Sequence, residues 1–363
     1  MGLGLTPLER LARARSDLRM GVAVVLRDGD GAAVVVAAET ASAERLAELR
    51  ALGPVDVALT DWRARTLKAR AYDGDLARVL LPSDADIDWV RATADPSSDL
   101  AWPMKGPYLS RRGGGAALHR AAIALCKQAH LLPAVLVVPM PLEAAAVLAE
   151  GQELSRVDIC DVPLDGGPPA LEEIAAARVP LEVSQAGKVR VFRPLDGGEE
   201  HYAVEIGAPD RSRAVLCRLH SACFTGDLLG SLKCDCGPQL HAALGQIAAE
   251  GAGVLLYLNQ EGRGIGLANK MRAYALQDQG FDTVEANHRL GFEDDERDFR
   301  IGANILTTLG FSEIRLMTNN PRKVAMMQGC GLTVVERVPL KVGRTRFNTR
   351  YLDTKAAKSG HLL

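Results

Sequence analysis

The stretch RLHSACFTGDLLGSLKCDCGPQLH, residues 218–241, decides which fold and which chemistry we expect of this sequence. Its cysteines Cys223, Cys234 and Cys236 lie within fourteen residues, in polar surroundings. Thiolates bind zinc strongly, and three of them leave one position of a tetrahedral zinc for water, as in a catalytic site. His220 or His241 as a fourth ligand would instead close a structural site. The spacing leaves both interpretations open, together with buried cysteines that hold no metal.

The segment that follows predicts a strand, a glycine-rich loop and a helix. Val254–Leu258 is continuously apolar, as a buried strand is, and the loop NQEGRGIG (259–266) leads into an amphipathic pattern over 267–279. Backbone N–H groups at such a turn favour an anion. Arg263 offers bidentate contacts to phosphate, and Glu261 can accept hydrogen bonds from a guanine. The alternative is a turn in which the glycines only allow the backbone to bend.

A second turn of the same kind lies further along the chain. The sequence predicts a strand at 313–317, the turn TNNP, a short helix and another strand at 333–337, which together make a βαβ unit. Thr318 and Lys323 can both reach a phosphate near the start of that helix. A capped helix with a solvated lysine is the alternative. Two such turns beside a cysteine cluster favour a nucleotide site.

Composition indicates a globular protein of about two domains. The chain has 363 residues, of which 47% are apolar, and a formal net charge of −2, which disfavours nucleic-acid binding through bulk charge. No apolar run approaches the roughly 18 to 20 residues of a membrane span. The N-terminus lacks a secretory signal, so we expect a cytoplasmic protein without membrane contact. Seven cysteines, an odd number, predict thiols or metal ligands rather than disulfides.

The alternation of apolar runs and amphipathic stretches along the sequence predicts two mixed α/β domains, an α/β (α+β) fold class. Residues 1–160 alternate apolar runs with alanine-rich amphipathic stretches. Prolines and glycines at 161–178 predict a linker with a short helical piece, and a second α/β block covers 179–340. The last residues, 341–363, carry a net charge of +5 and are expected to form a mobile tail. In the first block, strands are predicted at 22–26, 34–38, 55–59 and 135–138, and a helix at 118–129.

The second block resembles GTP cyclohydrolase II, the first enzyme of riboflavin biosynthesis. The motifs that carry the resemblance are RLHSACFTGD, SLKCDCGPQL, NQEGRGIGLANKMRAYALQDQGFDTVEANHRLGF, DDERDF and TNNPRK, in this order and spacing. The resemblance implies hydrolysis of GTP to 2,5-diamino-6-ribosylamino-4(3H)-pyrimidinone 5′-phosphate, formate and diphosphate. It also implies one zinc ion per subunit, magnesium on the triphosphate and a homodimer.

The resemblance assigns a role to individual residues of this chain. Cys223, Cys234 and Cys236 are expected to hold zinc, which activates the water that attacks C8 of the guanine. Asp295 matches the family's proton acceptor, Arg297 its proposed nucleophile on the α-phosphate, and Tyr274 a tyrosine near the zinc water. The residues expected to bind GTP are Arg218, Leu219, His220, Ser221, Ala222, Gln239, Glu261, Gly262, Arg263, Thr283, Thr318 and Lys323.

Two of these assignments meet a physical or sequence objection. A guanidinium has no free lone pair at neutral pH, so Arg297 is either activated by Asp295 or stabilises the developing charge while water attacks. Ala222 stands where the family commonly has glutamate, which is harmless if only the backbone of that residue faces the ligand.

The first block is similar to 3,4-dihydroxy-2-butanone 4-phosphate synthase, with departures at its working residues. The likeness lies in residues 17–39 and 118–137. The acidic metal-binding loop of that enzyme is replaced by RDGDGAA (27–33), and its Gly-His-Thr-Glu motif by Ala-Leu-His119-Arg120. We therefore expect this domain to be inactive as a synthase, with a dimerisation or regulatory role, and His119 to be a leftover or solvated residue. The alternatives are a bifunctional enzyme and a GTP-sensing module without turnover.

Overall fold

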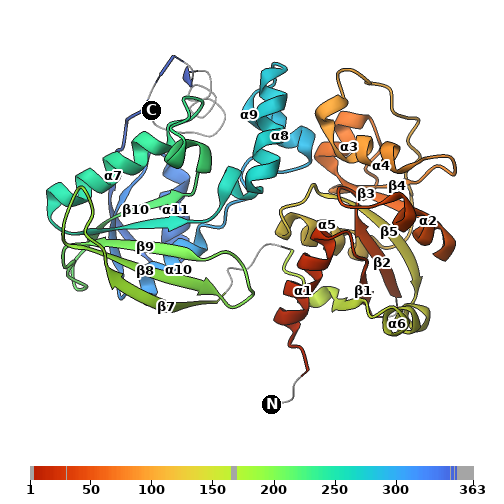
Figure 1. Ribbon diagram of the computed structural model, residues 1–363, viewed down its shortest axis with the longest axis horizontal. Coiled ribbons are helices and arrows are strands. Elements are labelled where there is room, and N and C mark those ends of the chain that lie inside the picture. The colour runs from red at the N-terminus through yellow and green to blue at the C-terminus, as the bar shows by residue number, and fades with distance from the viewer. Residues whose placement is uncertain (1–3, 30, 165–169, 344, 347, 350–363) are drawn as a thin grey trace. The chain divides into compact units, whose positions relative to one another are not determined.

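The computed structural model describes residues 4–29, 31–164, 170–343, 345–346 and 348–349. The chain forms two compact units, each built on its own mixed sheet (Figure 1). The first unit comprises Met1–Gly167 together with Ala268–Glu296, and the second comprises Pro168–Leu267 together with Arg297–Leu363. The predicted fold class, two mixed α/β domains, is confirmed.

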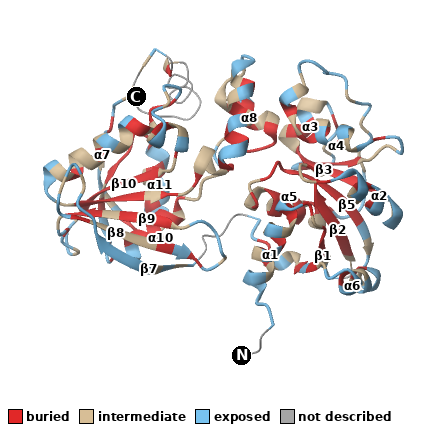
Figure 2. Ribbon diagram, in the orientation of Figure 1, coloured by how far each residue is buried: buried red, intermediate tan, exposed pale blue. Residues whose placement is uncertain are grey.

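The sheet of the first unit has six strands in the order β4-β3-β5-β2-β1-β6. Only the β1–β6 pair is parallel among the paired strands. The strands are β1 (Val24–Asp28), β2 (Gly31–Ala37), β3 (Asp56–Thr60), β4 (Leu76–Leu80), β5 (Ala134–Pro141) and β6 (Ser155–Asp158). Four of them lie where runs of valine and alanine predicted strands. These runs are almost wholly buried, as Figure 2 shows for the centre of the sheet, so burial on both faces selects the apolar pattern.

The first unit contains eight α-helices in the described part of the chain, two of them from the later segment 268–296. They are α1 (Pro7–Arg19), α2 (Ala43–Leu52), α3 (Asp61–Leu67), α4 (Ile87–Ala94), α5 (Ala117–Gln128), α6 (Leu142–Gly151), α8 (Gly266–Asp278) and α9 (Thr283–Leu290), with short 3₁₀ turns η1 (Pro96–Ser98) and η2 (Ile159–Asp161). Helix α8 begins in the second unit, at Gly266 and Leu267. Helix α5 confirms the helix predicted at 118–129, and its Ala122, Leu125 and Cys126 pack into the core.

His119 on α5 is buried rather than solvated. The residue is 2% exposed, and its Nε2 lies 3.1 Å from Oδ2 of Asp56, a fully buried carboxylate that also accepts from Arg111. Although burial raises the pKa of Asp56, hydrogen bonds from His119 and Arg111 leave that pKa below its usual value. The expectation of a solvated histidine is therefore wrong, because the ring completes a buried ion cluster.

The second unit is built on a seven-stranded sheet in the order β13-β12-β10-β11-β9-β8-β7. Strands β13, β12, β10 and β11 are mutually parallel, and β9, β8 and β7 continue antiparallel. The strands are β7 (Leu171–Arg178), β8 (Gly187–Pro194), β9 (His201–Ile206), β10 (Val215–Ser221), β11 (Gly253–Leu258), β12 (Glu313–Met317) and β13 (Thr333–Val338). The predicted strands at 254–258, 313–317 and 333–337 are thus present.

Helices cover both faces of this sheet. They are α7 (Cys236–Glu250), α10 (Arg300–Thr308) and α11 (Pro321–Gly329), with a π-turn η3 (Phe224–Leu228) and a 3₁₀ turn η4 (Glu261–Gly264). Ile305 of α10 and Met327 of α11 pack with Leu256 in one core, whereas Ile247 of α7 packs with Leu255 in another. Alternate residues of β11 therefore face opposite helices, as the period of a strand requires.

Two expectations about chain organisation differ from the structure, and a third falls mostly outside the described residues. The stretch 161–178 contains β7, a strand paired with β8, where a short helical piece was expected; strand pairing overrides the helical propensity of its alanines. Residues 268–296 pack with the N-terminal half, although the sequence places them in the second block. Of the expected tail 341–363, residues 350–363 lie outside the described residues, and Asn348 is buried, with its side chain hydrogen-bonded to Gly343 O at 2.7 Å. Among the described helices, none has the length and apolar character needed to cross a membrane.

Candidate active site and metal centre

The candidate site of the second unit lies where three parallel strands end. Strand β10 leads into the cysteine loop at Cys223, the adjacent β11 leads into Glu261, and β12 leads into Thr318. The strands are in register at this edge, with Ser221 opposite Leu258. Carboxyl ends of parallel strands are where α/β sheets bind ligands, because the loops that follow them meet there.

The three predicted thiols come together. Sγ atoms of Cys223, Cys234 and Cys236 all lie within 4.8 Å of one another, and those of Cys223 and Cys234 are 3.8 Å apart. Hydrogen bonding to the Cys223 thiol raises the pKa of both Cys234 and Cys236. A cation would relieve this crowding, and thiolates suit zinc. Among the described residues no histidine joins the cluster, which favours three protein ligands over a closed site of four.

Gly226 makes room for the cluster. A Cβ at this position would lie 2.7 Å from Sγ of Cys234 and 3.1 Å from Sγ of Cys223. Its own N–H donates to Sγ of Cys223 at 3.3 Å, an interaction that favours a thiolate. The residues present therefore fit a metal centre, because three soft ligands lie close together and Gly226 leaves them the space that they need.

Asp227 ties the cysteine loop to the sheet. Its carboxylate lies 3.0 Å from Nε2 of His220 and accepts from the Tyr257 hydroxyl and from the Cys223 N–H, each at 3.0 Å. Burial lowers the pKa of His220, and burial beside Asp227 raises that of Tyr257. His220 is therefore turned toward Asp227, while His241 is exposed on α7. Sequence reasoning missed Asp227, because a single aspartate four residues after a cysteine carries no signal of its own.

Glu261 closes over the same loop from β11. The N–H groups of Phe224 and Gly262 donate to its two carboxylate oxygens at 2.6 and 2.8 Å. Gly262 and Arg263 both adopt left-handed backbone conformations, with φ of 64° and 65°. This conformation is easy for glycine but strained for Arg263, and such strain clusters at functional sites.

Cationic side chains gather at the strand ends. The guanidinium of Arg218 donates to Met317 O and to Oε1 of Gln239, and its Nε is buried without a partner among described residues. Burial lowers the pKa of Arg218 to about 10. Arg297 and Lys323 lie 4.8 and 4.4 Å from the centre of one ring, that of Phe299. Such a group suits an anion of several charges.

Other predicted ligand residues of this unit make backbone or side-chain hydrogen bonds close to these cations. Ser221 Oγ is 3.4 Å from Arg297 Nη1, the Leu219 carbonyl accepts from Lys323 Nζ at 3.3 Å, and the Ala222 N–H donates to Leu258 O at 2.8 Å. Thr318 is 2% exposed. The structure thus brings together Arg218, Leu219, His220, Ser221, Ala222, Gln239, Glu261, Gly262, Arg263, Arg297, Thr318 and Lys323 at one edge of the sheet, beside the cysteines.

Three predicted residues belong to the first unit. Tyr274 lies on α8, with Lys270 Nζ 5.7 Å from its ring centre. Thr283 begins α9, and Gln277 Nε2 lies 3.4 Å from its hydroxyl. Asp295 follows α9 in an exposed loop.

Gln260 belongs to the predicted loop, but the sequence assigned its side chain no role of its own. Its Nε2 donates to Asp298 O at 2.8 Å, and its Oε1 is buried without a partner among the described residues. The residue lies between β11 and Glu261, inside the predicted loop 259–266. A lone glutamine after an apolar strand gives no signal for such a role.

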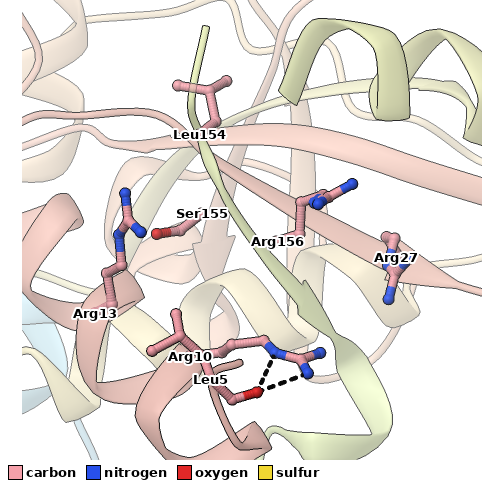
Figure 3. Close-up of a pocket in the computed structure, with 7 residues that line it drawn as sticks. All are labelled: Leu5, Arg10, Arg13, Arg27, Leu154, Ser155 and Arg156. Atoms are coloured by element: carbon pink, nitrogen blue, oxygen red, sulfur yellow. Dashed lines mark hydrogen bonds between the residues drawn. The ribbon is translucent and has the colours of Figure 1, made fainter. Parts of the chain in front are cut away.

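A separate cavity of about 440 Å³ lies in the first unit (Figure 3). Its walls come from α1, β1 and β6, with four arginines among the lining residues Leu5, Arg10, Arg13, Arg27, Leu154, Ser155 and Arg156. Arg10 donates twice to the Leu5 carbonyl, and Arg27 pairs with Asp158 at 2.7 Å. Because Arg10, Arg13 and Arg27 each hold a protein partner, we assign the cavity no ligand.

Comparison with known proteins places the chain in a family. The sequence profile of GTP cyclohydrolase II matches residues 172–339. A protein of Azospirillum brasilense named GTP cyclohydrolase-2 is 44% identical over 359 residues, which cover 96% of this chain and 93% of that protein. This chain belongs to the GTP cyclohydrolase II family. It is accordingly an enzyme, a hydrolase of that family.

Shorter members of the GTP cyclohydrolase II family match about half of the chain. The GTP cyclohydrolase-2 proteins of Cronobacter sakazakii and Salmonella typhimurium are 56% and 55% identical over 193 residues, 53% of this chain and 98% of each relative. A solved structure, a two-domain 3,4-dihydroxy-2-butanone 4-phosphate synthase from A. baumannii, covers 92% of this chain and 100% of its own, at 17% identity. Its TM-score of 0.33 is too low to support an argument.

Proposed function

We propose that this chain hydrolyses GTP to 2,5-diamino-6-ribosylamino-4(3H)-pyrimidinone 5′-phosphate, formate and diphosphate, the first step of riboflavin biosynthesis. The observation that carries the proposal is the cluster of Cys223, Cys234 and Cys236 beside buried cations, in a chain of the GTP cyclohydrolase II family. Soft ligands for one metal and cationic groups for a triphosphate are the two requirements of this reaction.

Zinc is the metal we assign to the three thiolates, one ion per subunit. Zinc held there supplies a Lewis acid that lowers the pKa of water toward neutrality. At this centre the Gly226 N–H and the Asp227 carboxylate hold the Cys223 loop in place by hydrogen bonds. Magnesium would accompany the triphosphate, because a diphosphate leaving group needs its charge neutralised.

GTP is expected to bind with its phosphates beside the cationic side chains at the carboxyl ends of the parallel strands. Arg218, Lys323 and Arg263 would hold phosphate oxygens, and the N–H groups at the start of α11 favour the same charge. Glu261 would accept from the guanine, since a carboxylate retains lone pairs beyond the two hydrogen bonds it already accepts. The remaining ligand residues proposed are Leu219, His220, Ser221, Ala222, Gln239, Gly262, Thr283 and Thr318.

Three further residues are proposed to act in the reaction. Asp295 would accept the proton, and Tyr274 would donate a hydrogen bond near the metal centre. Arg297 would act at the α-phosphate, either as a nucleophile activated by Asp295 or by stabilising the charge that develops while water attacks, because a guanidinium alone has no free lone pair.

We further propose that residues 1–160 are inactive as a 3,4-dihydroxy-2-butanone 4-phosphate synthase. In support, Arg27 pairs with Asp158 and Arg120 with Asp75, whereas a magnesium site in this region would need carboxylates free to bind the ion. The catalytic domain we propose is built on the seven-stranded sheet of the second unit, which includes β7. A cytoplasmic homodimer is the assembly we propose.

The test is to incubate the zinc-loaded protein with GTP and magnesium and to quantify formate and diphosphate. Equimolar release of both supports the proposal. Tight GTP binding without either product would contradict it and favour a GTP sensor. Ribulose 5-phosphate in a parallel reaction examines the first domain, since formate from that sugar would show a bifunctional enzyme.

A further inference from the structure

Residues of the N-terminal half hold the loop that carries Asp295. The loop, residues 293–296, follows α9 and its C-cap Gly291, and like the N-terminal half it belongs to the first compact unit. We propose that Trp62 and Lys127 are positioning residues for Asp295, so that the synthase-like domain serves GTP hydrolysis. This inference rests on the proposed role of Asp295.

Trp62 fixes the side of the loop that precedes Asp295. Its Nε1 donates to Oε2 of Glu293 at 3.0 Å, and its ring stacks on His288 with centroids 3.6 Å apart and planes 6° from parallel. His288 Nε2 lies 2.7 Å from Oδ1 of Asp294. The two residues before Asp295 are therefore both tied, directly or through one ring, to a side chain of α3.

Lys127 fixes the side that follows Asp295. Its Nζ lies 2.7 Å from Oε1 of Glu296, with the lysine and glutamate side chains 24% and 20% exposed. The same oxygen accepts from the Glu293 N–H at 2.9 Å, which closes the loop on itself. Asp295 thus lies between two anchored residues, and α5 of the synthase-like domain supplies the second anchor.

The base of the loop is anchored in the same way. Thr60 Oγ1 donates to Gly291 O at 2.8 Å in a buried position. Gly291 has φ of +89°, and a Cβ there would lie 2.8 Å from Thr60 Oγ1 and 2.9 Å from Pro133, so glycine alone fits. Arg63, 1% exposed, donates to Arg289 O at 3.5 Å. The end of α9 is therefore held against β3 and α3.

A proton acceptor on an exposed loop needs such support. Catalytic groups act only from a narrow range of positions, and a misplacement of about 1 Å can lower the rate about a hundredfold. Loops are mobile by default, because few contacts restrain their backbone. The contacts of Glu293 with Trp62 and of Glu296 with Lys127 restrain the backbone on both sides of Asp295. These two contacts are made by the neighbouring residues and not by the Asp295 carboxylate.

The experiment uses two substitutions in the full-length, zinc-loaded chain. Lys127→Met removes the charge but keeps a flexible apolar side chain, and Trp62→Phe keeps a ring to stack on His288 but removes the N–H. The matched control is Arg120→Met, which removes an ion pair of the same unit, Arg120–Asp75, that includes no residue of 293–296. We expect kcat for formate release to fall about tenfold or more in both variants, with the KM for GTP and the zinc content unchanged. The control should keep the wild-type kcat.

Two readouts separate positioning from general stability. In hydrogen exchange, the backbone amides of 293–296 should exchange faster in Lys127→Met than in wild type. Their exchange rates in Arg120→Met should equal those of wild type. The double variant Lys127→Glu with Glu296→Lys should recover much of the lost kcat, because the ion pair is restored with opposite polarity.

The outcomes distinguish this inference from the proposed function. If the wild type releases formate and both variants match its kcat, Trp62 and Lys127 do not position Asp295, while the proposed function stands. If the wild type releases no formate, the proposed function fails irrespective of the variants. Unchanged exchange at 293–296 in Lys127→Met would overturn the anchoring itself.

Discussion

Replacing Gly226 by alanine tests the geometry of the cysteine cluster. The added Cβ would lie 2.7 Å from Sγ of Cys234, which is 0.7 Å short of the 3.4 Å at which ordinary contacts begin. Zinc–ligand distances hold to within about 0.2 Å, so a sulfur displaced by most of that shortfall no longer fits a tetrahedral ion. The backbone of Gly226 does not have a positive φ, so the cost of the substitution is steric.

We expect Gly226→Ala to lose zinc and activity together. Overpacking of this kind costs about 1–3 kcal/mol, and here it falls on the metal ligands. The assay is the zinc content after dialysis against chelators of increasing strength, alongside formate release from GTP. The control is Gly245→Ala in α7, where a Cβ meets nothing within 4 Å and alanine should stabilise the helix by about 0.5–1 kcal/mol. Gly226→Ala protein that keeps full zinc affinity and turnover would refute the assignment of these sulfurs to one ion.

Three further predictions address the second unit. Cys234→Ser should abolish zinc retention and formate release together, because one of the three thiolates is lost; zinc analysis and a formate assay check this, and unchanged activity would refute the metal assignment. Asp227→Asn should lower zinc affinity about 10- to 100-fold, and Tyr257→Phe should lower it less, because it removes one of the three hydrogen bonds to that carboxylate; competition with a chelating dye measures both. Burial lowers the pKa of His201 to about 4. Between pH 6.5 and 4 the unfolded chain therefore binds a proton at this residue, whereas the folded chain does not. The free energy of unfolding should fall by about 3 kcal/mol over this range. His201→Gln should flatten that dependence in denaturant titrations, and an unaltered slope would contradict it.

Local patterns were sufficient to predict seven of the thirteen described strands and the position of the two strand-to-helix turns. The apolar run Val254–Leu258 became β11 with one added residue, and the TNNP turn joins β12 to α11 as expected. Such features depend on periodicity and turn chemistry, which the sequence carries within a few residues. The cysteine cluster was predictable for a similar reason, since its members lie within one short segment.

Features that depend on distant contacts were not predictable. Strand β7 has helix-forming alanines, and its pairing with β8 decides its conformation. The stack of Trp62 on His288 joins residues more than two hundred positions apart, so neither residue signals the other. His119 was misjudged because its partner, Asp56, lies on a strand distant in sequence. In each case tertiary packing outweighed the local signal.

The fate of C8 of the guanine tests the central claim most directly. GTP labelled with ¹³C at C8 is incubated with the zinc-loaded chain and magnesium, and the label is followed by NMR. The proposed reaction predicts that the label leaves the purine and accumulates as formate, in proportion to diphosphate, and that Cys234→Ser protein leaves it in place. A label that stays in an intact guanine while diphosphate is released would contradict ring opening at the cysteine centre.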